Sequence, residues 1–279
     1  MSDAPFQDTP PTSEAAPLVA AWIRRAIAAA APGHVPLLLL SGAQGSGKST
    51  ALWQALGILD VPVAGASIDD FYLTPGERGA LARRMSPLLL TRGPPGTHDL
   101  ALLRDTVDRL RTATSGSDIN IPVFDKLSDD RVPKESWRRF SGRPAAIVIE
   151  GWLMGALPDA SAPDTTPLNA VEAEDTSGAW RRDQEEALAG PYAGLWDQAD
   201  SFCHILAPGF ETVLDWRLEQ EAALWRARGE AMPESRPAWI ARFIQHYERI
   251  TRRMLSGYRR PGTDIFIDTQ RRVKPAYSS

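Results

Sequence analysis

The chain has 279 residues, 43% of them hydrophobic, and a formal net charge of −4 at pH 7. That length and apolar content suffice for one domain with a sizeable core. No cluster of Lys and Arg stands apart from the acidic residues, which excludes sequence-independent nucleic-acid binding, because that function needs a concentrated basic face. The longest apolar runs are far too short to cross a bilayer, which excludes a membrane-spanning protein.

The first residues predict no folded element. Residues 1–16 are acidic and rich in proline, so we predict a disordered tail, followed by a single domain over 17–279. The tail lacks the basic start and the apolar stretch of a signal peptide, and we therefore expect a cytoplasmic protein. No apolar stripe that would mark a subunit interface can be separated from the core pattern, so the sequence leaves the oligomeric state open.

Helical patterns and short apolar strands alternate along the rest of the chain. Helices are predicted by apolar residues at helical spacing over 17–31, 51–59 and 100–112. Strands are predicted by short apolar runs over 34–42, 61–68, 145–151, 201–208 and 263–269. The polar stretch over 158–180 predicts a loop. This alternation favours an α/β fold with a parallel sheet flanked by helices.

The stretch GAQGSGKST, between an apolar strand and a helix, matches the P-loop pattern G-x-x-x-x-G-K-[ST]. Its glycines let backbone N–H groups surround phosphates, and the helix N-terminus adds positive potential. Lys48 would reach the β- and γ-phosphates, and the Ser49 hydroxyl would bind Mg²⁺. We expect the whole loop to bind a nucleoside triphosphate, through Gly42, Ala43, Gln44, Gly45, Ser46, Gly47, Lys48, Ser49 and Thr50.

A second acidic position belongs with this loop. Glu150 ends the apolar stretch IVIEG and would reach the metal or its water shell, as a Walker B acid does. The alternative for Glu150 is a solvated carboxylate at a strand end. No N-K-x-D element is present to read guanine, and the D-x-x-G match at 175–178 lies in the polar stretch, which argues against a GTPase. The preference between ATP and GTP stays open.

The stretch SIDDFYLT places Asp69 and Asp70 side by side where a strand is predicted to end. Unpaired carboxylates are costly next to an apolar core, so two of them call for a role. We expect this strand to lie beside the P-loop strand, with Asp69 at the mouth of the sheet where α/β folds bind ligands. The alternative is an Asx-turn that ends the strand.

Two loops carry further candidates for the acceptor side of the site. In FDKLSDDR, Lys126 and Arg131 could pair with the carboxylate of a hydroxy acid while Asp125 accepts from a hydroxyl; the alternative is a solvated charged loop. In RGPPGTHD, a rigid turn precedes His98 and Asp99. This loop could form a wall of the substrate site, or Asp99 could cap the helix that follows.

Several of these stretches together resemble one family. They are GAQGSGKST, SIDDFYLT, RGPPGTHD, PVFDKLSDDR, IEGW, WRLEQE and FIQHYERIT, in this order. The set resembles the P-loop D-glycerate 3-kinases, which are similar in fold to uridine, pantothenate and phosphoribulose kinases. The resemblance runs from Leu37 to Thr251. Leu127 and Asp129 depart from the family, in which the stretch after Phe-Asp-Lys more often reads Ser-rich and then Gly-Asp-Arg.

The resemblance implies a P-loop kinase fold that uses ATP and Mg²⁺ to phosphorylate a small hydroxy acid, D-glycerate, at its 3-hydroxyl. It implies that Asp69 is the base beside the acceptor hydroxyl, that Asp70 has a supporting role, and that Tyr72 and His98 belong to the acceptor site. The runner-up is a uridine- or pantothenate-kinase-like enzyme. An ATP-dependent regulatory or assembly protein without a small acceptor is the alternative from another class.

The stretch over 213–237 looks like a helix, a loop and the start of another helix. In related kinases this arrangement forms a lid over ATP, and its arginines neutralise the transferred phosphoryl group. The resemblance therefore implies a catalytic role for Arg217.

Overall fold

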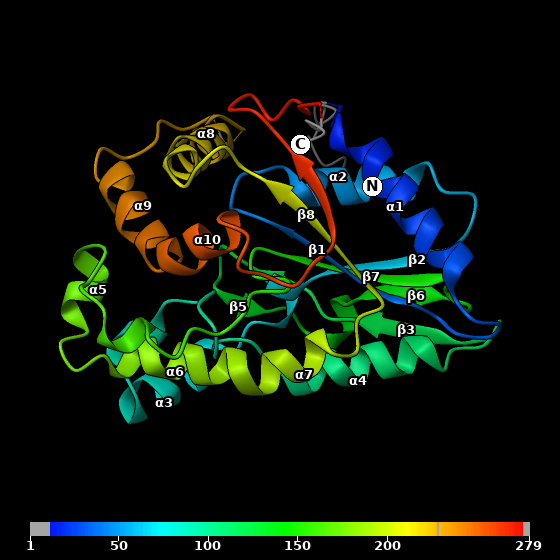
Figure 1. Cartoon of the computed structure of the whole chain (residues 1–279), viewed down its shortest axis with the longest axis horizontal. Coiled ribbons are helices and arrows are strands. Elements are labelled where there is room, and N and C mark those ends of the chain that lie inside the picture. The colour runs from blue at the N-terminus through cyan, green and yellow to red at the C-terminus, as the bar shows by residue number, and fades with distance from the viewer. Residues whose placement is uncertain (1–11, 228, 276–279) are drawn as a thin grey trace.

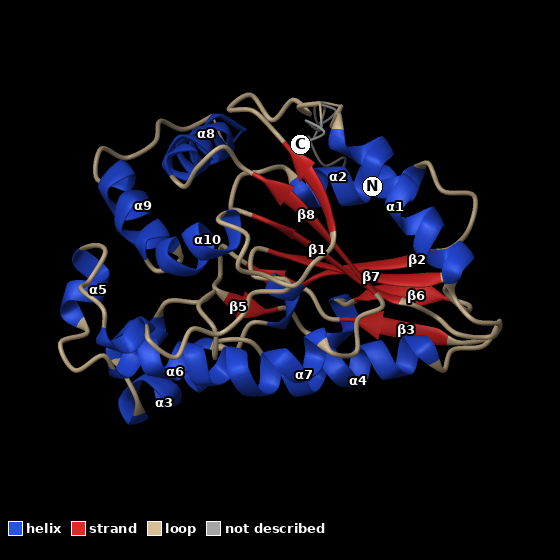
Figure 2. Ribbon diagram, viewed as in Figure 1, coloured by secondary structure: helices blue, strands red, loops and turns tan. Residues whose placement is uncertain are grey.

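The computed structural model describes residues 12–227 and 229–275. A five-stranded parallel sheet lies at its centre, in the order β2-β7-β1-β8-β9 (Figure 1 and Figure 2). Its strands are β1 (Leu37–Gly42), β2 (Val63–Ser67), β7 (Ala146–Gly151), β8 (Ser201–Leu206) and β9 (Thr263–Phe266). Each lies within a predicted strand, and the predicted α/β fold with a parallel sheet is confirmed.

Helices cover both faces of this sheet (Figure 1). α1 (Ala15–Ala29) and α2 (Lys48–Gly57) pack on one face. α4 (Leu100–Arg111) and α7 (Ala193–Trp196) pack on the other, together with the π-helical turn Leu188–Tyr192. The predicted helices over 17–31, 51–59 and 100–112 correspond to α1, α2 and α4.

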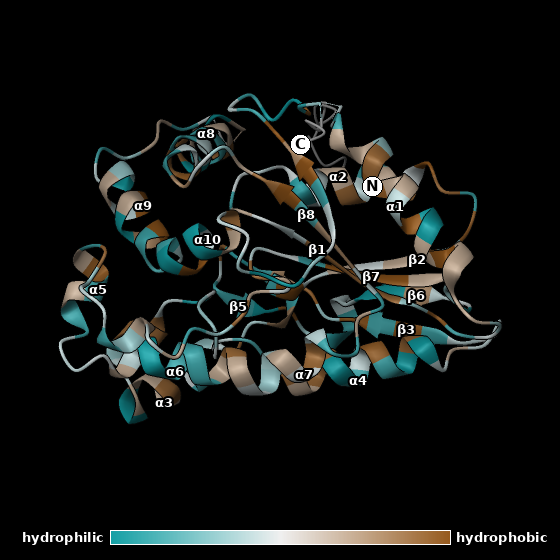
Figure 3. Cartoon of the chain, viewed as in Figure 1, coloured by the Kyte–Doolittle hydropathy of each residue, from teal (hydrophilic) through white to brown (hydrophobic). Residues whose placement is uncertain are grey.

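The central strand β1 shows why the core has two halves. Leu38 and Leu40 point to the side of α1 and α2, whereas Leu37 and Leu39 point to the side of α4. All four are fully buried, as expected of a strand covered on both faces. In Figure 3 the hydrophobic colour follows the central strands, while most helices show both colours.

The remaining elements lie around the central sheet. A 3₁₀ turn, η1 (Ile68–Phe71), follows β2 directly. Two antiparallel pairs are formed by β3 (Asp118–Ile121) with β6 (Arg138–Ser141), and by β4 (Phe124–Asp125) with β5 (Asp130–Arg131). The other helices are α3 (Pro75–Arg84), α5 (Ala170–Glu174), α6 (Ala179–Ala187), α8 (Glu211–Ala227), α9 (Arg236–Gln245) and α10 (Glu248–Leu255). The predicted helix–loop–helix over 213–237 corresponds to α8, its following loop and the start of α9.

The prediction of a loop over 158–180 is wrong for part of this stretch. This stretch contains α5 and the first residues of α6, and its Val171 and Trp180 join a small buried cluster. Its polar residues made it look like a loop, but several of them are paired. The Asp175 carboxylate accepts from the backbone N–H groups of Trp180 and Arg181 and from the Arg181 guanidinium. Pairing makes their burial possible.

Part of the predicted N-terminal tail, residues 1–11, lies outside the described residues. The backbone N–H of Ser13 donates to Gln54 Oε1 at 2.7 Å, and α1 begins at Ala15. The Glu14 carboxylate accepts from the backbone N–H of Val273 at 2.8 Å, so the start and the end of the described chain lie together (Figure 1). Among the residues that the structure describes, no helix is both long and apolar enough to cross a membrane.

The Pro-Pro-Gly turn in RGPPGTHD packs directly against the core. The Tyr247 hydroxyl donates to the carbonyl of Arg92 at 2.7 Å, and the Trp152 indole N–H donates to the carbonyl of Gly93 at 3.1 Å. A Cβ added to Gly93 would overlap the Tyr247 ring and hydroxyl, and Gly93 also has a φ of +111°. Tyr247 is buried against Trp152, so it has little room to move away.

We predict that Gly93→Ala destabilises the protein by about 1–3 kcal/mol more than Gly96→Ala does. Gly96 also has a positive φ, +93°, but a Cβ there would meet nothing within 4 Å. Both variants therefore carry the backbone strain, and only the first adds the overlap with Tyr247. Urea unfolding of the two variants and of the parent measures the difference, and equal losses would contradict the packing argument.

Candidate active site

The P-loop joins β1 to α2 in a conformation that depends on glycine. Gly45 and Gly47 have φ of +81° and +82°, a region that side chains disfavour. A Cβ at Gly45 would also lie 2.5 Å from Cβ of Trp216, so α8 packs directly on the loop. Lys48 is the first residue of α2, and its side chain therefore starts at the positive end of that helix.

Glu150 reaches the P-loop because β7 lies between β1 and β2. In the sheet register Glu150 stands opposite Leu40 on one side and Ser67 on the other. The expectation that the SIDDFYLT strand lies beside the P-loop strand is therefore wrong, since β7 separates the two strands. The Ser49 hydroxyl donates to Glu150 Oε1 at 2.7 Å, and Lys48 Nζ lies 3.9 Å from Oε2.

These residues fit a magnesium ion. Glu150 is 2% exposed, and its Oε2 atom is buried without a hydrogen-bond partner within the described chain. Mg²⁺ prefers oxygen ligands and is often held by one or two carboxylates together with substrate phosphates. Residues 12–227 and 229–275 contain no group of three or more His, Cys, Asp or Glu that could hold a metal by themselves. The Ser49 and Glu150 oxygens would therefore need nucleotide phosphates to complete the ion's coordination.

The two adjacent aspartates face different ways. Asp70 Oδ2 accepts from the backbone N–H of Ser67, and the Ser67 hydroxyl accepts from the N–H of Asp69, which together cap η1. The other Asp70 oxygen accepts from the backbone N–H of Phe124 at 3.3 Å. Asp70 thus ties the end of β2 to the β4–β5 pair, and the Asp69 carboxylate is left to face the P-loop side.

Asp69 is partly buried, with 21% of its side chain exposed, and it is ionised. Its Oδ1 accepts from the Tyr72 hydroxyl at 2.7 Å, and its Oδ2 from Lys126 Nζ at 2.6 Å. Burial alone would raise the pKa of this carboxyl, but the charges of Lys126 and Lys48 and the two hydrogen bonds hold that pKa well below its usual range. The Lys126 pKa is raised in turn, chiefly by the charge of Asp69.

A small cavity of about 70 Å³ joins these groups. It is lined by Gln44, Lys48, Asp69, Tyr72, Arg92, Lys126, Trp152, Arg217, Phe243 and Tyr247. Arg217 comes from α8, and its Nη1 donates to Gln220 Oε1 at 2.7 Å. The cavity thus brings together a P-loop lysine, an ionised carboxylate and an arginine of α8 from parts of the chain that are far apart in sequence.

Sequence comparisons point to kinases. No protein-family model matches the chain. The chain is 32% identical over 232 residues to the uncharacterized kinase mug58 of Schizosaccharomyces pombe, an alignment that covers 77% of this chain and 79% of that protein. The chain belongs to the P-loop kinase family related to D-glycerate 3-kinase.

One further sequence relative of this P-loop kinase and one solved structure of similar fold are named as D-glycerate 3-kinases. The chain is 31% identical over 231 residues to the chloroplastic D-glycerate 3-kinase of Arabidopsis thaliana, covering 77% of this chain and 48% of that protein. The solved structure of a D-glycerate 3-kinase from Cryptococcus neoformans matches with a TM-score of 0.74 at 24% identity, covering 92% of this chain and 97% of that one. The structural likeness confirms the fold.

Two predicted acceptor residues of the kinase lie outside the cavity lining. His98 is buried beside Tyr72, with ring centroids 4.8 Å apart, and its Nδ1 is 2.5 Å from the Tyr192 hydroxyl. Burial lowers the pKa of His98 to about 4, which makes it neutral at physiological pH. Asp125 is turned into its own hairpin, where its carboxylate accepts from the backbone N–H groups of Leu127 and Ser128.

Arg131 also lies outside the cavity lining, but it contacts the backbone of Tyr72, which lines the cavity. Its Nη2 donates to the carbonyl of Tyr72 at 2.9 Å and lies 3.4 Å from the Asp99 carboxylate. The other oxygen of Asp99 accepts from the backbone N–H of Leu102 at 2.9 Å, so Asp99 caps α4, as the second reading of this residue predicts. Asp99 therefore anchors the hairpin through Arg131.

The cavity lining also contains Arg92, Trp152, Phe243 and Tyr247, for which the sequence predicts no role in the site. Arg92 forms an ion pair with Asp129, whose other carboxylate oxygen pairs with the buried Arg78. Asp129 has a φ of +57°, a conformation that favours the glycine more common in the family. The signal for Trp152 and Tyr247 was their place in IEGW and FIQHYERIT, but no pattern links Arg92 to a residue 37 positions later.

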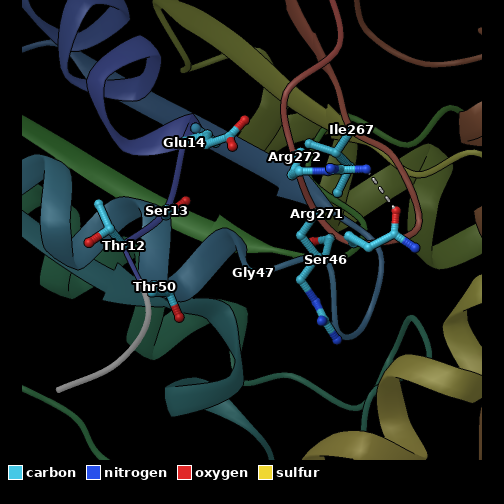
Figure 4. Close-up of a pocket in the computed structure, with 11 residues that line it drawn as sticks. Thr12, Ser13, Glu14, Ser46, Gly47, Thr50, Ile267, Arg271 and Arg272 are labelled. Carbon is cyan, nitrogen blue, oxygen red and sulfur yellow. Dashed lines mark hydrogen bonds between the residues drawn. The ribbon is translucent and has the colours of Figure 1, made fainter. Parts of the chain in front are cut away.

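A second cavity, of about 180 Å³, is lined by other residues of the P-loop segment (Figure 4). Ser46, Gly47 and Thr50 form its floor. Its walls come from the two ends of the described chain, Thr12 to Ala15 on one side and Ile267 with Gln270 to Arg272 on the other. Arg271 ties the second wall to the loop, because its Nε donates to the carbonyl of Gly45 at 2.6 Å.

We predict that Asp70 makes the stability of this kinase depend on pH in a specific window. Burial raises the pKa of Asp70 to about 6, although Arg138 and two backbone N–H groups oppose the shift. Because this pKa lies above the unfolded value of about 3.9, the bound proton stabilises the folded state below about pH 4, and this contribution is lost as pH rises through about 6.

The side chain of Asp70→Asn cannot ionise. The unfolding free energy of this variant relative to the parent should therefore be more favourable at pH 7.5 than at pH 4.5, by on the order of 2 kcal/mol. The free energy of urea unfolding of both proteins at the two pH values measures this difference. The same mutational change at both values would show that Asp70 does not titrate in this window.

Proposed function

We propose that the protein transfers the γ-phosphoryl group of ATP to a hydroxyl of a small hydroxy acid, and that the acceptor is the 3-hydroxyl of D-glycerate. One observation carries this proposal: Lys48, the ionised Asp69 and Arg217 line the same cavity. A protein that only switches between nucleotide states has no need of a partly buried carboxylate beside its P-loop. The relatives that bear the D-glycerate 3-kinase name support the choice of acceptor.

The nucleotide has a place for each of its parts. The phosphates would lie along the loop from Gly42 to Thr50. The adenine ring would lie in the second cavity, between the two ends of the described chain (Figure 4). Ser49 and Glu150 would hold Mg²⁺, which supplies positive charge between the phosphate oxygens when it is bound. This assignment leaves the first cavity free for the acceptor.

The chemistry assigned to Asp69 follows from its position and charge. The acceptor oxygen forms a bond to the γ-phosphorus, the bond from that phosphorus to the β-phosphate oxygen breaks, and the hydroxyl proton passes to the Asp69 carboxylate. Phosphoryl transfer has a loose transition state, so the acceptor proton leaves late and positioning matters more than strong basicity. The low pKa of Asp69 is compatible with that role. Lys48 and Arg217 stabilise the charge on the transferred group.

Lys126 is the best-placed group for the acceptor carboxylate. Its ammonium has three N–H donors, and Asp69 is the partner that it uses in this structure. Its side chain is 58% exposed, so it can turn toward an anion without breaking a packed contact. Arg92 is less available, because it is already paired with Asp129. A neutral acceptor such as glycerol would leave Lys126 without a new partner.

A coupled assay of ADP release, with D-glycerate, glycerol, uridine and pantothenate as acceptors, tests the function. We expect D-glycerate to raise ADP formation at least about tenfold and to yield 3-phosphoglycerate, because a missing charged partner typically costs about 1.5–3 kcal/mol. Glycerol should be a poor acceptor for the same reason.

Other results would replace the proposal with one of its alternatives. Stimulation by uridine or pantothenate but not by D-glycerate would make this a kinase for another alcohol. Slow ADP formation that no acceptor accelerates would favour a regulatory or assembly protein.

We predict that Asp69→Asn lowers kcat by about 10²-fold or more, the usual range for loss of a positioned acid or base. The amide keeps the shape of the side chain but cannot accept the proton. ATP binding should not weaken, since Asp69 is negative and lies near the phosphate site. Asp70→Asn is the matched control and should do less damage to kcat, because Asp70 is hydrogen-bonded to backbone groups. A larger loss from the control would identify Asp70 as the reacting carboxylate.

A further inference from the structure

The amide group of Gln44 has no hydrogen-bond partner, although both of its polar atoms are buried. Both its Nε2 and its Oε1 atoms are inaccessible and make no hydrogen bond within the described residues. A buried amide that stays unpaired costs about 1–3 kcal/mol, and folded proteins rarely leave one so. Such a group inside a cavity is therefore a candidate for contact with a ligand.

The P-loop divides its side chains between the two cavities. Gln44 and Lys48 line the cavity that contains Asp69, whereas Ser46, Gly47 and Thr50 line the second cavity. The backbone around Gln44 has little freedom to change this, because Gly45 is packed against Trp216. The Gln44 amide is thus held on the side of the loop where the acceptor would bind.

The chemistry of the amide argues for a hydroxyl ligand. A glutamine side chain has two N–H donors and one carbonyl acceptor. Ionised phosphate oxygens only accept hydrogen bonds, so a phosphate would satisfy Nε2 and leave Oε1 unpaired. A hydroxyl both donates and accepts, and one or two hydroxyl oxygens can satisfy the whole amide.

We propose that the Gln44 amide binds a second hydroxyl of the acceptor, next to the hydroxyl held by Asp69. Both side chains line the same cavity of about 70 Å³, and the proposed acceptor carries its two hydroxyls on neighbouring carbons. Gln44 then makes the enzyme select acceptors that carry such a pair. This inference rests on the proposed function and specifies the chemistry of its acceptor site.

The test compares D-glycerate with 3-hydroxypropionate, which lacks only the hydroxyl on the neighbouring carbon. The wild-type protein should prefer D-glycerate in kcat/KM by about 10–100-fold, the effect of leaving a buried polar group unpaired. Gln44→Met has nearly the same size and no hydrogen-bonding amide. It should lose about 10–100-fold in kcat/KM with D-glycerate and change little with 3-hydroxypropionate, so that the preference disappears.

Two measurements accompany these rates. Gln198→Met changes an exposed glutamine elsewhere and should retain the wild-type preference. Thermal unfolding of each variant establishes that it is folded, and ATP affinity is measured by titration without an acceptor. We expect Gln44→Met to bind ATP within about threefold of the wild-type value, well below the tenfold change that 1.4 kcal/mol would produce.

The inference and the proposed function fail in different ways. If the protein phosphorylates D-glycerate and Gln44→Met keeps the wild-type preference, the inference is wrong. A loss of ATP affinity of tenfold or more in this variant would likewise overturn it, because the amide would then serve the nucleotide. If the wild-type protein does not phosphorylate D-glycerate, the proposed acceptor is wrong, and unchanged ATP affinity in Gln44→Met still supports a side chain that faces away from the nucleotide.

Discussion

The parallel register of β2, β7 and β1 determines where the P-loop, Glu150 and Asp69 lie relative to one another. Parallel strands end at the same edge of a sheet, so the P-loop after β1, Glu150 in β7 and the turn after β2 all arrive there. Because β7 is the middle strand, its carboxylate can accept from Ser49 on one side while Asp69 follows on the other. A shift of one residue would turn Glu150 to the other face of the sheet.

Electrostatic balance at this edge explains how a partly buried carboxylate remains charged. Asp69 would be costly to bury alone, but it has a tyrosine hydroxyl and a lysine within hydrogen-bond distance and a second lysine nearby. Asp70, one residue later, lacks such partners and has only backbone N–H groups and a more distant arginine. Two neighbouring residues of one type thus differ in pKa because one lies beside two lysines and the other caps a turn.

The side of the cavity that contains Arg92 and Lys126 is built from loops joined by ion pairs. Asp129 joins Arg78 of α3 to Arg92 of the Pro-Pro-Gly turn, and Arg131 joins the same hairpin to Asp99 at the start of α4. These ion pairs link segments that share no regular secondary structure. They also use charges that would otherwise be available to a substrate, which leaves Lys126 as the basic group of the hairpin that lines the cavity.

The sequence by itself determined the fold class, the strands of the sheet, the P-loop and its connection to α2. These features are local: apolar runs form strands, and glycines at fixed spacing allow one loop conformation. Glu150 and Asp69 were also visible, since each follows an apolar strand. The helices within 158–180 were not predicted, because the polar residues of this stretch have their partners in distant parts of the chain. Glu172, for example, accepts a hydrogen bond from Arg249.

Only the tertiary structure decided the order of the strands, the pairing of Arg92 with Asp129 and the direction of each side chain. It showed that Asp125 and His98 do not line the cavity, whereas Arg92, Trp152 and Tyr247 do. These facts depend on contacts between residues that are distant in sequence, and no local pattern encodes such contacts. The unpaired amide of Gln44 was likewise not visible in the sequence. Whether a side chain lacks a hydrogen-bond partner depends on all of its neighbours in the folded structure.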